Sequence, residues 1–179
     1  LAKMVLDKML LQKSSQPPDE AWSQASTIID RAIQQVRTMS HLLHPPLLDE
    51  VGLLSALAWY TDGLTKRSGI RTSLDVQPRD FPRLATEVET AIFRIVQEAL
   101  TNVFRHSEAH QVWITLSQNN GAISVAVRDD GKGIAQKVAD LRPDSVGVGI
   151  GGMRQRAREL GGELKLSNLG PGTLLELQI

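Results

Sequence analysis

The sequence predicts an α+β fold: a two-layer α/β sandwich whose mixed, mostly antiparallel sheet carries helices on one face, preceded by a helical hairpin. Two observations support this prediction. Residues 1–48 show helical periodicity interrupted by prolines, without a β-rich run. From residue 70 onward, β-rich runs alternate with helical patterns and with turn signals such as Asn119-Asn-Gly121. We therefore expect two domains, residues 1–48 and residues 49–179.

The first domain is expected to form two helices. Residues 1–13 repeat apolar side chains at helical spacing, and Ser14-Ser-Gln-Pro-Pro18 breaks that helix. Asp19 is a suitable N-cap for a longer helix, and apolar residues from Trp22 to Leu43 follow at alternating spacings of three and four. This spacing indicates the seam of a helical hairpin or a dimeric bundle, and an amphipathic helix packed on its own domain fits it equally well. Pro45-Pro46 ends the second helix.

The second domain alternates helices and strands. Helical patterns with an apolar face cover residues 51–67, 85–106 and 153–160. β-rich runs bounded by turn residues cover residues 70–76, 111–117, 122–128, 163–167 and 173–179. A loop is expected from Asp129 to about Val148, and Gly161-Gly162 ends the last helix.

The composition excludes several classes of function. With 41% hydrophobic and 22% charged residues, the 179-residue chain is typical of a globular protein. Twenty basic residues balance twenty acidic ones, so no bulk charge favours direct binding to nucleic acid. The absence of cysteine excludes disulfides, thiolate catalysis and cysteine-ligated zinc. No apolar run approaches the roughly 20 residues that span a bilayer. Because the chain starts abruptly at Leu1, we expect a fragment of a longer protein.

A polar stripe interrupts the strongest helical pattern. Glu98, Asn102 and His106 are four residues apart, with Arg105 beside them, so all share one helical face. The adjoining face is apolar and would pack on a sheet; it consists of Ile92, Ile95, Val96, Ala99 and Val103. Amide or carboxylate oxygens can hold magnesium and cationic groups can hold phosphate, although an ordinary solvated face would show the same stripe. Asn102, a poor helix former, favours the functional interpretation.

Two glycine-rich runs follow the strands. Asp129-Asp-Gly-Lys-Gly-Ile134 comes directly after a strand, where a carboxylate can accept from the exocyclic amine of a base; an Asp-Gly turn is the simpler alternative. Gly147-Val-Gly-Ile-Gly-Gly152 contains the dinucleotide-binding spacing but lacks the strand directly before it. Its remaining role is a lid over phosphates at the start of a helix, and Arg154 or Arg156 could reach a phosphate or solvent.

In this order, the three motifs resemble the ATP-binding domain of bacterial sensor histidine kinases, the Bergerat (GHKL) fold shared with gyrase, Hsp90 and MutL. The segment from Ser40 to Leu53 is similar to the proline-containing junction of the subgroup paired with NarL/LuxR-type response regulators. The resemblance implies an enzyme that transfers the γ-phosphate of ATP to a histidine for relay to an aspartate of a response regulator receiver domain. It also implies ATP and Mg²⁺ as cofactors, a homodimer formed through the N-terminal helices and a cytoplasmic location, which includes the cytoplasmic part of a membrane-bound sensor.

The resemblance also assigns roles to individual residues. Asn102 would be the magnesium ligand and Glu98 a supporting catalytic or water-orienting group, while Arg105 and His106 would approach the phosphates. Asp129 would recognise the adenine amino group and Thr173 would support the adenine. The residues that would shape the base pocket are Gly131, Lys132, Gly133 and Ile134. Those of the ATP lid and its hinge are Gly147, Val148, Gly149, Ile150 and Gly151.

The sequence departs from the family in its acceptor histidine. The subgroup carries this histidine on the first dimerisation helix, but residues 1–13 contain none. His41 and His44 lie where the family has no acceptor, so junction packing or capping is the simpler role for both. We therefore expect ATP binding without autophosphorylation of this chain. A hydrolysing GHKL ATPase with Glu98 as base, a nucleotide-binding module without kinase activity and a dimerisation module that binds no nucleotide are the alternatives.

Overall fold

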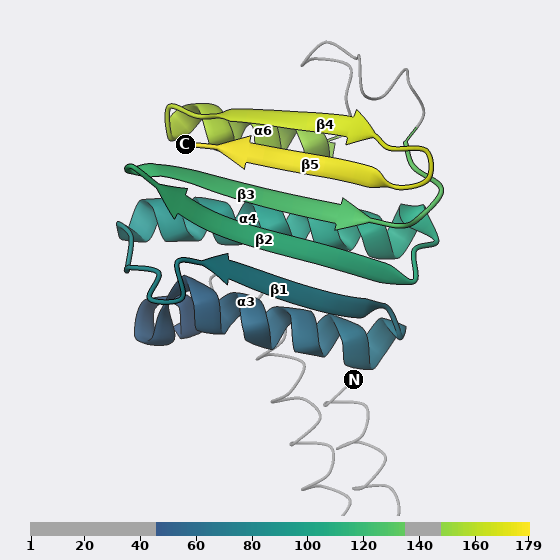
Figure 1. Ribbon diagram of the computed structural model, residues 1–179, viewed down its shortest axis with the longest axis horizontal. Helices are drawn as coiled ribbons and strands as arrows, with labels where there is room; N and C mark the ends of the chain where they lie inside the picture. The colour runs from purple at the N-terminus through teal and green to yellow at the C-terminus, as the bar shows by residue number, and fades with distance from the viewer. Residues whose placement is uncertain (1–45, 135–147) are drawn as a thin grey trace, which may run out of the picture. The chain divides into compact units, whose positions relative to one another are not determined.

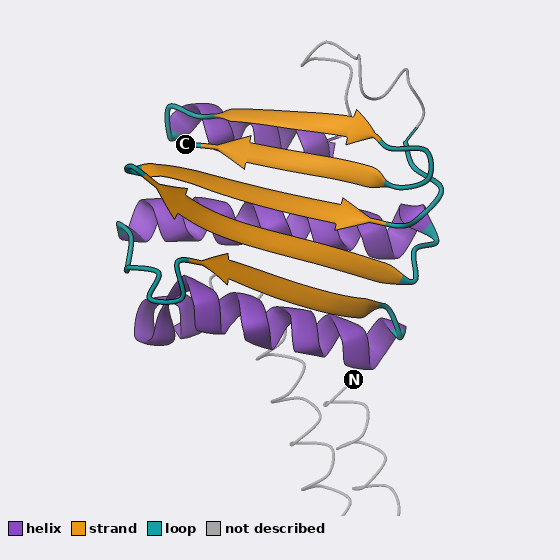
Figure 2. Ribbon diagram, in the orientation of Figure 1, coloured by secondary structure: helices purple, strands orange, loops and turns teal. Residues whose placement is uncertain are grey.

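The computed structural model describes residues 46–134 and 148–179 of the chain. These residues form two layers, a five-stranded sheet and three α-helices packed on one of its faces (Figures 1 and 2). The predicted two-layer α+β fold is thereby confirmed. The helical hairpin expected before it, with His41 and His44, lies outside the described residues.

The sheet brings distant parts of the chain together at one end. In spatial order its strands are β1 (Arg71–Gln77), β2 (Gln111–Asn119), β3 (Ala122–Asp129), β5 (Thr173–Gln178) and β4 (Glu163–Asn168). β1 runs parallel to β2, and the other neighbours are antiparallel, as expected for a mixed, mostly antiparallel sheet. Arg128 pairs with Leu174, so the next residues outward, Asp129 and Thr173, are neighbours where β3 ends and β5 begins.

The first described helix, α3 (Pro46–Ser68), begins earlier than the predicted 51–67. Proline is tolerated as a first helical residue because its missing N–H would have no partner there. The helix is kinked at Gly52, whose φ of 82° and ψ of 174° are not helical. A β-carbon on Gly52 would lie 3.0 Å from Nη1 of Arg83, so the absence of a side chain at Gly52 leaves room for Arg83. Arg83 in turn donates from Nε to the buried carboxylate of Glu89 at 3.0 Å.

The second helix changes its winding at the polar stripe. α4 (Thr86–Asn102) is α-helical, but Val103–Ser107 forms a π-helix, η1, so the prediction of a continuous α-helix to His106 is wrong in its last turn. Ser107 is buried; its hydroxyl donates to the Val103 carbonyl oxygen at 2.8 Å and accepts from the Ala109 N–H at 3.1 Å. These bonds satisfy backbone groups at the helix end. Single π-helical turns are often found near functional sites.

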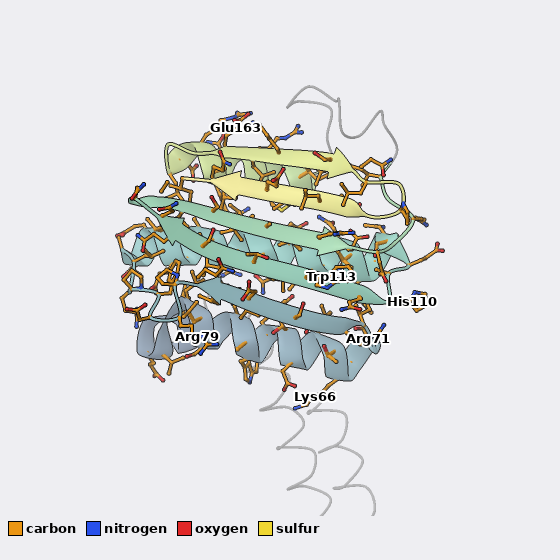
Figure 3. The ribbon with its side chains drawn as sticks, in the orientation of Figure 1. Lys66, Arg71, Arg79, His110, Trp113 and Glu163 are labelled. Atoms are coloured by element: carbon orange, nitrogen blue, oxygen red, sulfur yellow. The ribbon has the colours of Figure 1, made fainter. Side chains whose placement is uncertain are left out.

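The core lies between the sheet and the helices. All five residues of the predicted apolar face of α4 are buried, as are Val112, Ile114 and Leu116, the alternate residues of β2. Burying each large aliphatic side chain stabilises the fold by about 1.5–3 kcal/mol. Trp113 belongs to the opposite face of the sheet, where the Arg128 guanidinium lies 5.2 Å from its ring centroid (Figure 3). Within the described ranges, none of the helices combines the length and apolarity needed to cross a membrane.

Candidate functional site

A cavity of about 340 Å³ opens between the helices and the sheet, at the end where β3 stops and β5 starts. It is lined by residues of α4, η1, three strands, the loop after β3 and α6 (Val148–Glu159). Its apolar lining consists of Ala99, Val103, Val127, Ile134, Ile150, Met153, Leu166 and Leu175. Its other lining residues are Asn102, His106, Ser107, Asp129, Lys132, Gly133 and Thr173. An apolar chamber with few polar groups is typical of a small-molecule site.

Asp129 is the buried acidic residue of this cavity. Only 3% of it is exposed, and its Oδ1 accepts a hydrogen bond from the Gly131 N–H at 2.8 Å. Burial raises the pKa of this carboxyl group, and hydrogen bonds from Gly131 and Thr173 oppose the rise. Because a buried carboxylate is unfavourable unless its oxygens are paired, Asp129 can offer a ligand a hydrogen-bond acceptor shielded from water.

Asp130, the next residue, has a different task. Its Oδ1 accepts from the backbone N–H groups of His110, at 2.8 Å, and Gln111, at 2.9 Å, where β2 begins. These hydrogen bonds, that from Gln111 foremost, lower the pKa of Asp130. The carboxylate therefore ties the loop after β3 to the start of β2 and lies outside the cavity lining.

The loop of residues 131–134 is held close to the end of η1. A β-carbon on Gly131 would lie 2.2 Å from the Ser107 carbonyl oxygen and 2.8 Å from Oδ1 of Asp129, so only glycine fits there. The same Ser107 oxygen accepts from the Lys132 N–H at 2.8 Å. The Lys132 ammonium forms an exposed ion pair with Glu108 at 2.6 Å. Four residues of this run thus line the cavity: Asp129, Lys132, Gly133 and Ile134.

The polar stripe of the long helix divides at the cavity. Asn102 and His106 line it, whereas Glu98 and the exposed Arg105 do not. The Glu98 carboxylate instead lies against α6, because a β-carbon on Gly149 would come within 2.1 Å of Oε1 of Glu98. The change to π-helical winding alters the direction of His106 relative to an α-helix, and both Asn102 and His106 still face the same space.

The structure describes two of the three glycines expected in the lid, and both belong to a helix. Val148 is the first residue of α6, and Gly149 and Gly151 belong to its first turns. Ile150, between these glycines, lines the cavity. Gly147 lies outside the described residues.

Several lining residues were not predicted as part of a site. Ala99, Val103 and Met153 have the apolar character and spacing of core residues, and they are buried. The cavity is a hollow in that same core, so no periodicity distinguishes its lining from ordinary packing. Asn168, in the predicted loop between the last two strands, does not line the cavity but donates to the carbonyl oxygen of the lining residue Ile134 at 2.8 Å. The sequence did not indicate this contact.

Comparison with known proteins places this site in a family. The family model for histidine kinase-, DNA gyrase B-, and HSP90-like ATPases matches residues 87–179. The sensor histidine kinase MctS of Rhizobium johnstonii is 33% identical over 147 residues, which cover 82% of this chain and 32% of MctS. The chain thus spans about a third of the length of that curated relative.

Solved structures agree with the fold. The histidine kinase domain of the blue-light activated histidine kinase of Erythrobacter litoralis EL346 has a TM-score of 0.59 and 25% identity, covering 71% of this chain and 60% of that one. Full-length ShkA in complex with AMPPNP has a TM-score of 0.57 and 24% identity, covering 71% and 29% of the two chains. The chain therefore belongs to the histidine kinase-, DNA gyrase B- and HSP90-like ATPase family, as an ATP-binding region of the sensor histidine kinase type.

Proposed function

We propose that the cavity binds Mg-ATP and that the whole protein uses it to phosphorylate a histidine. One observation carries the proposal: the buried Asp129 carboxylate lies in an otherwise mainly apolar cavity whose helical wall carries Asn102 and His106. A flat base fits the apolar chamber, and an exocyclic amine is the donor that a buried carboxylate requires. Family membership and the AMPPNP bound by ShkA support an adenine nucleotide as the ligand.

The adenine end of the nucleotide would lie at Asp129 and Thr173, which are neighbours across β3 and β5. Gly131 and Gly133 would allow the backbone to approach the base, beside Lys132 and Ile134. At pH 7 an ionised Asp129 accepts hydrogen bonds only, so it favours a base that presents an amino group. Guanine and hypoxanthine, which present a carbonyl oxygen at the corresponding ring position, would face that carboxylate without a donor.

The phosphate end would lie at Asn102 and His106, with the exposed Arg105 nearby in the chain. Within the described ranges, no three Asp, Glu, His or Cys side chains gather as a metal-ligand set. The Asn102 amide oxygen would hold Mg²⁺ together with phosphate oxygens, a ligand set that suits this ion. Bound Mg²⁺ would supply neutralising charge for phosphoryl transfer. Glu98 would orient water or support Asn102, and residues 147–151 would cover the phosphates.

For the whole protein, we propose a sensor histidine kinase that relays phosphate to a response regulator of the NarL/LuxR type. Residues 1–48 would be part of its dimerisation region and residues 49–179 its catalytic domain, in the cytoplasm and without direct contact to nucleic acid. The similarity to the sensor histidine kinase MctS supports this proposal. The protein's chemistry would consist mainly of positioning and charge neutralisation.

Calorimetric titration with ATP, with and without Mg²⁺, tests the binding site. Asp129→Asn should weaken ATP at least about tenfold under both conditions, the loss expected for a hydrogen bond to a charged acceptor. Asn102→Ala should weaken ATP mainly when Mg²⁺ is present. Asp130→Asn is the matched control, since its carboxylate binds two backbone N–H groups outside the cavity. Equal losses for Asp129→Asn and Asn102→Ala in the absence of metal would contradict the assigned roles.

Incubation with γ-labelled ATP tests the relay. No acid-labile phosphate should form on this chain alone, because residues 1–13, the expected first dimerisation helix, contain no histidine. Phosphate on His41 or His44 would refute this expectation. Release of free phosphate that depends on Glu98 would instead indicate a hydrolysing ATPase.

A further inference from the structure

The side chain of Asn168 connects two walls of the cavity. Asn168 is the last residue of β4 and is exposed. Its Nδ2 donates to the Ile134 carbonyl oxygen at 2.8 Å, a bond between residues 34 positions apart. Its Oδ1 accepts from the Gly170 N–H at 3.3 Å. An acceptor on one side and a donor on the other fix the orientation of the amide.

The same amide packs on the backbone of the glycine loop. A β-carbon on Gly133 would lie 2.3 Å from Oδ1 of Asn168, and Gly133 has a φ of +78°. Glycine is therefore needed at residue 133 both for its conformation and for the approach of Asn168. Asn168 thus touches this loop at two consecutive residues, Gly133 and Ile134.

The turn that follows Asn168 also packs against the end of β3, next to the cavity. The Leu169 N–H donates to the Gly172 carbonyl oxygen at 2.9 Å, which closes the turn before β5. A β-carbon on Gly172 would lie 2.0 Å from the carbonyl oxygen of Asp129, so this turn lies directly on the end of β3. The next residue, Thr173, lines the cavity.

The opposite side of the glycine loop is held in another way. There the Lys132 N–H donates to the Ser107 carbonyl oxygen at 2.8 Å, and the Lys132–Glu108 ion pair is exposed at both partners. A backbone hydrogen bond fixes the η1 side, while the Asn168 side chain fixes the β4–β5 side. Asn168 is not among the residues that line the cavity, whereas Gly133, Ile134 and Thr173 are.

We propose that Asn168 is a positioning residue of the nucleotide site, which holds Gly133 and Ile134 at the spacing from Thr173 that the bound base requires. This inference rests on the proposed binding of adenine nucleotides. Because Asn168 acts on the base-binding end, its loss weakens every adenine ligand by the same factor, whatever its number of phosphates.

Asn168→Asp is the discriminating variant, because it keeps the shape and an oxygen for the Gly170 N–H but removes the donor to Ile134. Calorimetry with adenosine, ADP and ATP, at a temperature well below unfolding, should show affinities about three- to tenfold weaker for all three ligands, as expected for one hydrogen bond. Asn168→Ala should give the same equal losses. Asn119→Asp makes the same charge change on an exposed residue at the far end of β2 and should leave all three affinities unchanged.

Three results would overturn the inference. Wild-type affinities in both Asn168 variants would show that the amide positions nothing. Losses that grow from adenosine to ATP would assign the Asp effect to repulsion of phosphates. A lowered Tm with unchanged affinities would assign Asn168 to stability alone. If the wild-type chain bound none of the three ligands, the proposed function itself would fail, and this inference with it.

Discussion

Replacing Gly131 by alanine places a methyl group where the structure has no room for one. The new β-carbon would lie 2.2 Å from the Ser107 carbonyl oxygen, 2.7 Å from Cβ of Ser107 and 2.8 Å from Oδ1 of Asp129. Real β-carbon atoms essentially never come within 3.0 Å of such a neighbour, so the new β-carbon and the Ser107 oxygen must separate by at least 0.8 Å, the difference between 3.0 and 2.2 Å. Backbone and a buried carboxylate must move, because no flexible side-chain tip lies in the way.

The magnitude follows from what that movement breaks. The Ser107 oxygen accepts the Lys132 N–H, and loss of this hydrogen bond costs about 1 kcal/mol. Overpacking destabilises the fold by about 1–3 kcal/mol more. Alanine makes the unfolded chain less flexible than glycine does, which offsets about 0.4–1 kcal/mol of this loss. Together these contributions lower the free energy of unfolding by about 1–4 kcal/mol. ATP affinity should fall as well, because the methyl group displaces the Asp129 carboxylate.

Urea unfolding followed by circular dichroism measures this change, provided that the slope of the transition stays constant. Gly63→Ala is the matched control: its β-carbon would meet only the Nη1 tip of the exposed Arg67, at 2.9 Å. That tip can swing away, and alanine in a helix interior is favoured over glycine by about 0.5–1 kcal/mol, so Gly63→Ala should stabilise. A Gly131→Ala variant as stable as the wild type would refute the steric argument.

Three further predictions concern ionisable groups. Burial raises the folded-state pKa of Asp129 above its ordinary value near 3.8. The folded state therefore loses stability as pH rises from 3.8 through this raised pKa. Asp129→Asn should therefore raise Tm at pH 7, and this gain in Tm should vanish as pH falls below 3.8. A pH-independent difference in Tm would contradict this cause. Asp130 has a lowered pKa, so its stabilisation is present above 3.8 and lost as pH falls through the lowered value. Asp130→Ala should lower Tm at pH 7 and converge with wild type in acid. Glu89→Ala should cost about 2 kcal/mol in urea unfolding, because two donors lose their buried acceptor. Glu89→Gln, which keeps that oxygen, should cost less than half as much; equal costs would refute the role of the oxygen.

Much of the fold could be predicted from the sequence because its elements have clear periods. The alternation in β2 and β3 and the apolar stripe of α4 each correspond to a face that is buried. The run from Asp129 to Ile134 could be noticed because it follows a predicted strand and contains two glycines, but the choice of Asp129 within it came from the resemblance to histidine kinases. Where the structure differs by one or two residues at an element's end, local hydrogen bonding decides the boundary.

The differences arise from contacts between distant residues. In the π-helical turn after Asn102, the Ser107 hydroxyl donates to the Val103 carbonyl oxygen and accepts from the Ala109 N–H. The Ser107 carbonyl oxygen also accepts from the N–H of Lys132, a contact that no helical spacing reveals. Gly52, where α3 is kinked, packs without a side chain against Arg83, 31 positions later by residue number. Glu98 shares a predicted face with Asn102 but lies against Gly149, because α6 packs there.

The strand order has a consequence for how the domain folds during synthesis. β5 is the last strand in the sequence, yet it lies between β3 and β4, and β4 pairs with no other strand of the described sheet. β4 therefore has no strand to pair with until β5 is made. Until then, the backbone N–H and C=O groups on the β5 side of β3 also have no strand partner. Such non-local pairing slows folding and leaves strand edges exposed in the nascent chain. Asp129 and Thr173 meet only when β5 adds to β3, so a chain interrupted before residue 173 would lack the proposed nucleotide site even with every earlier strand in place.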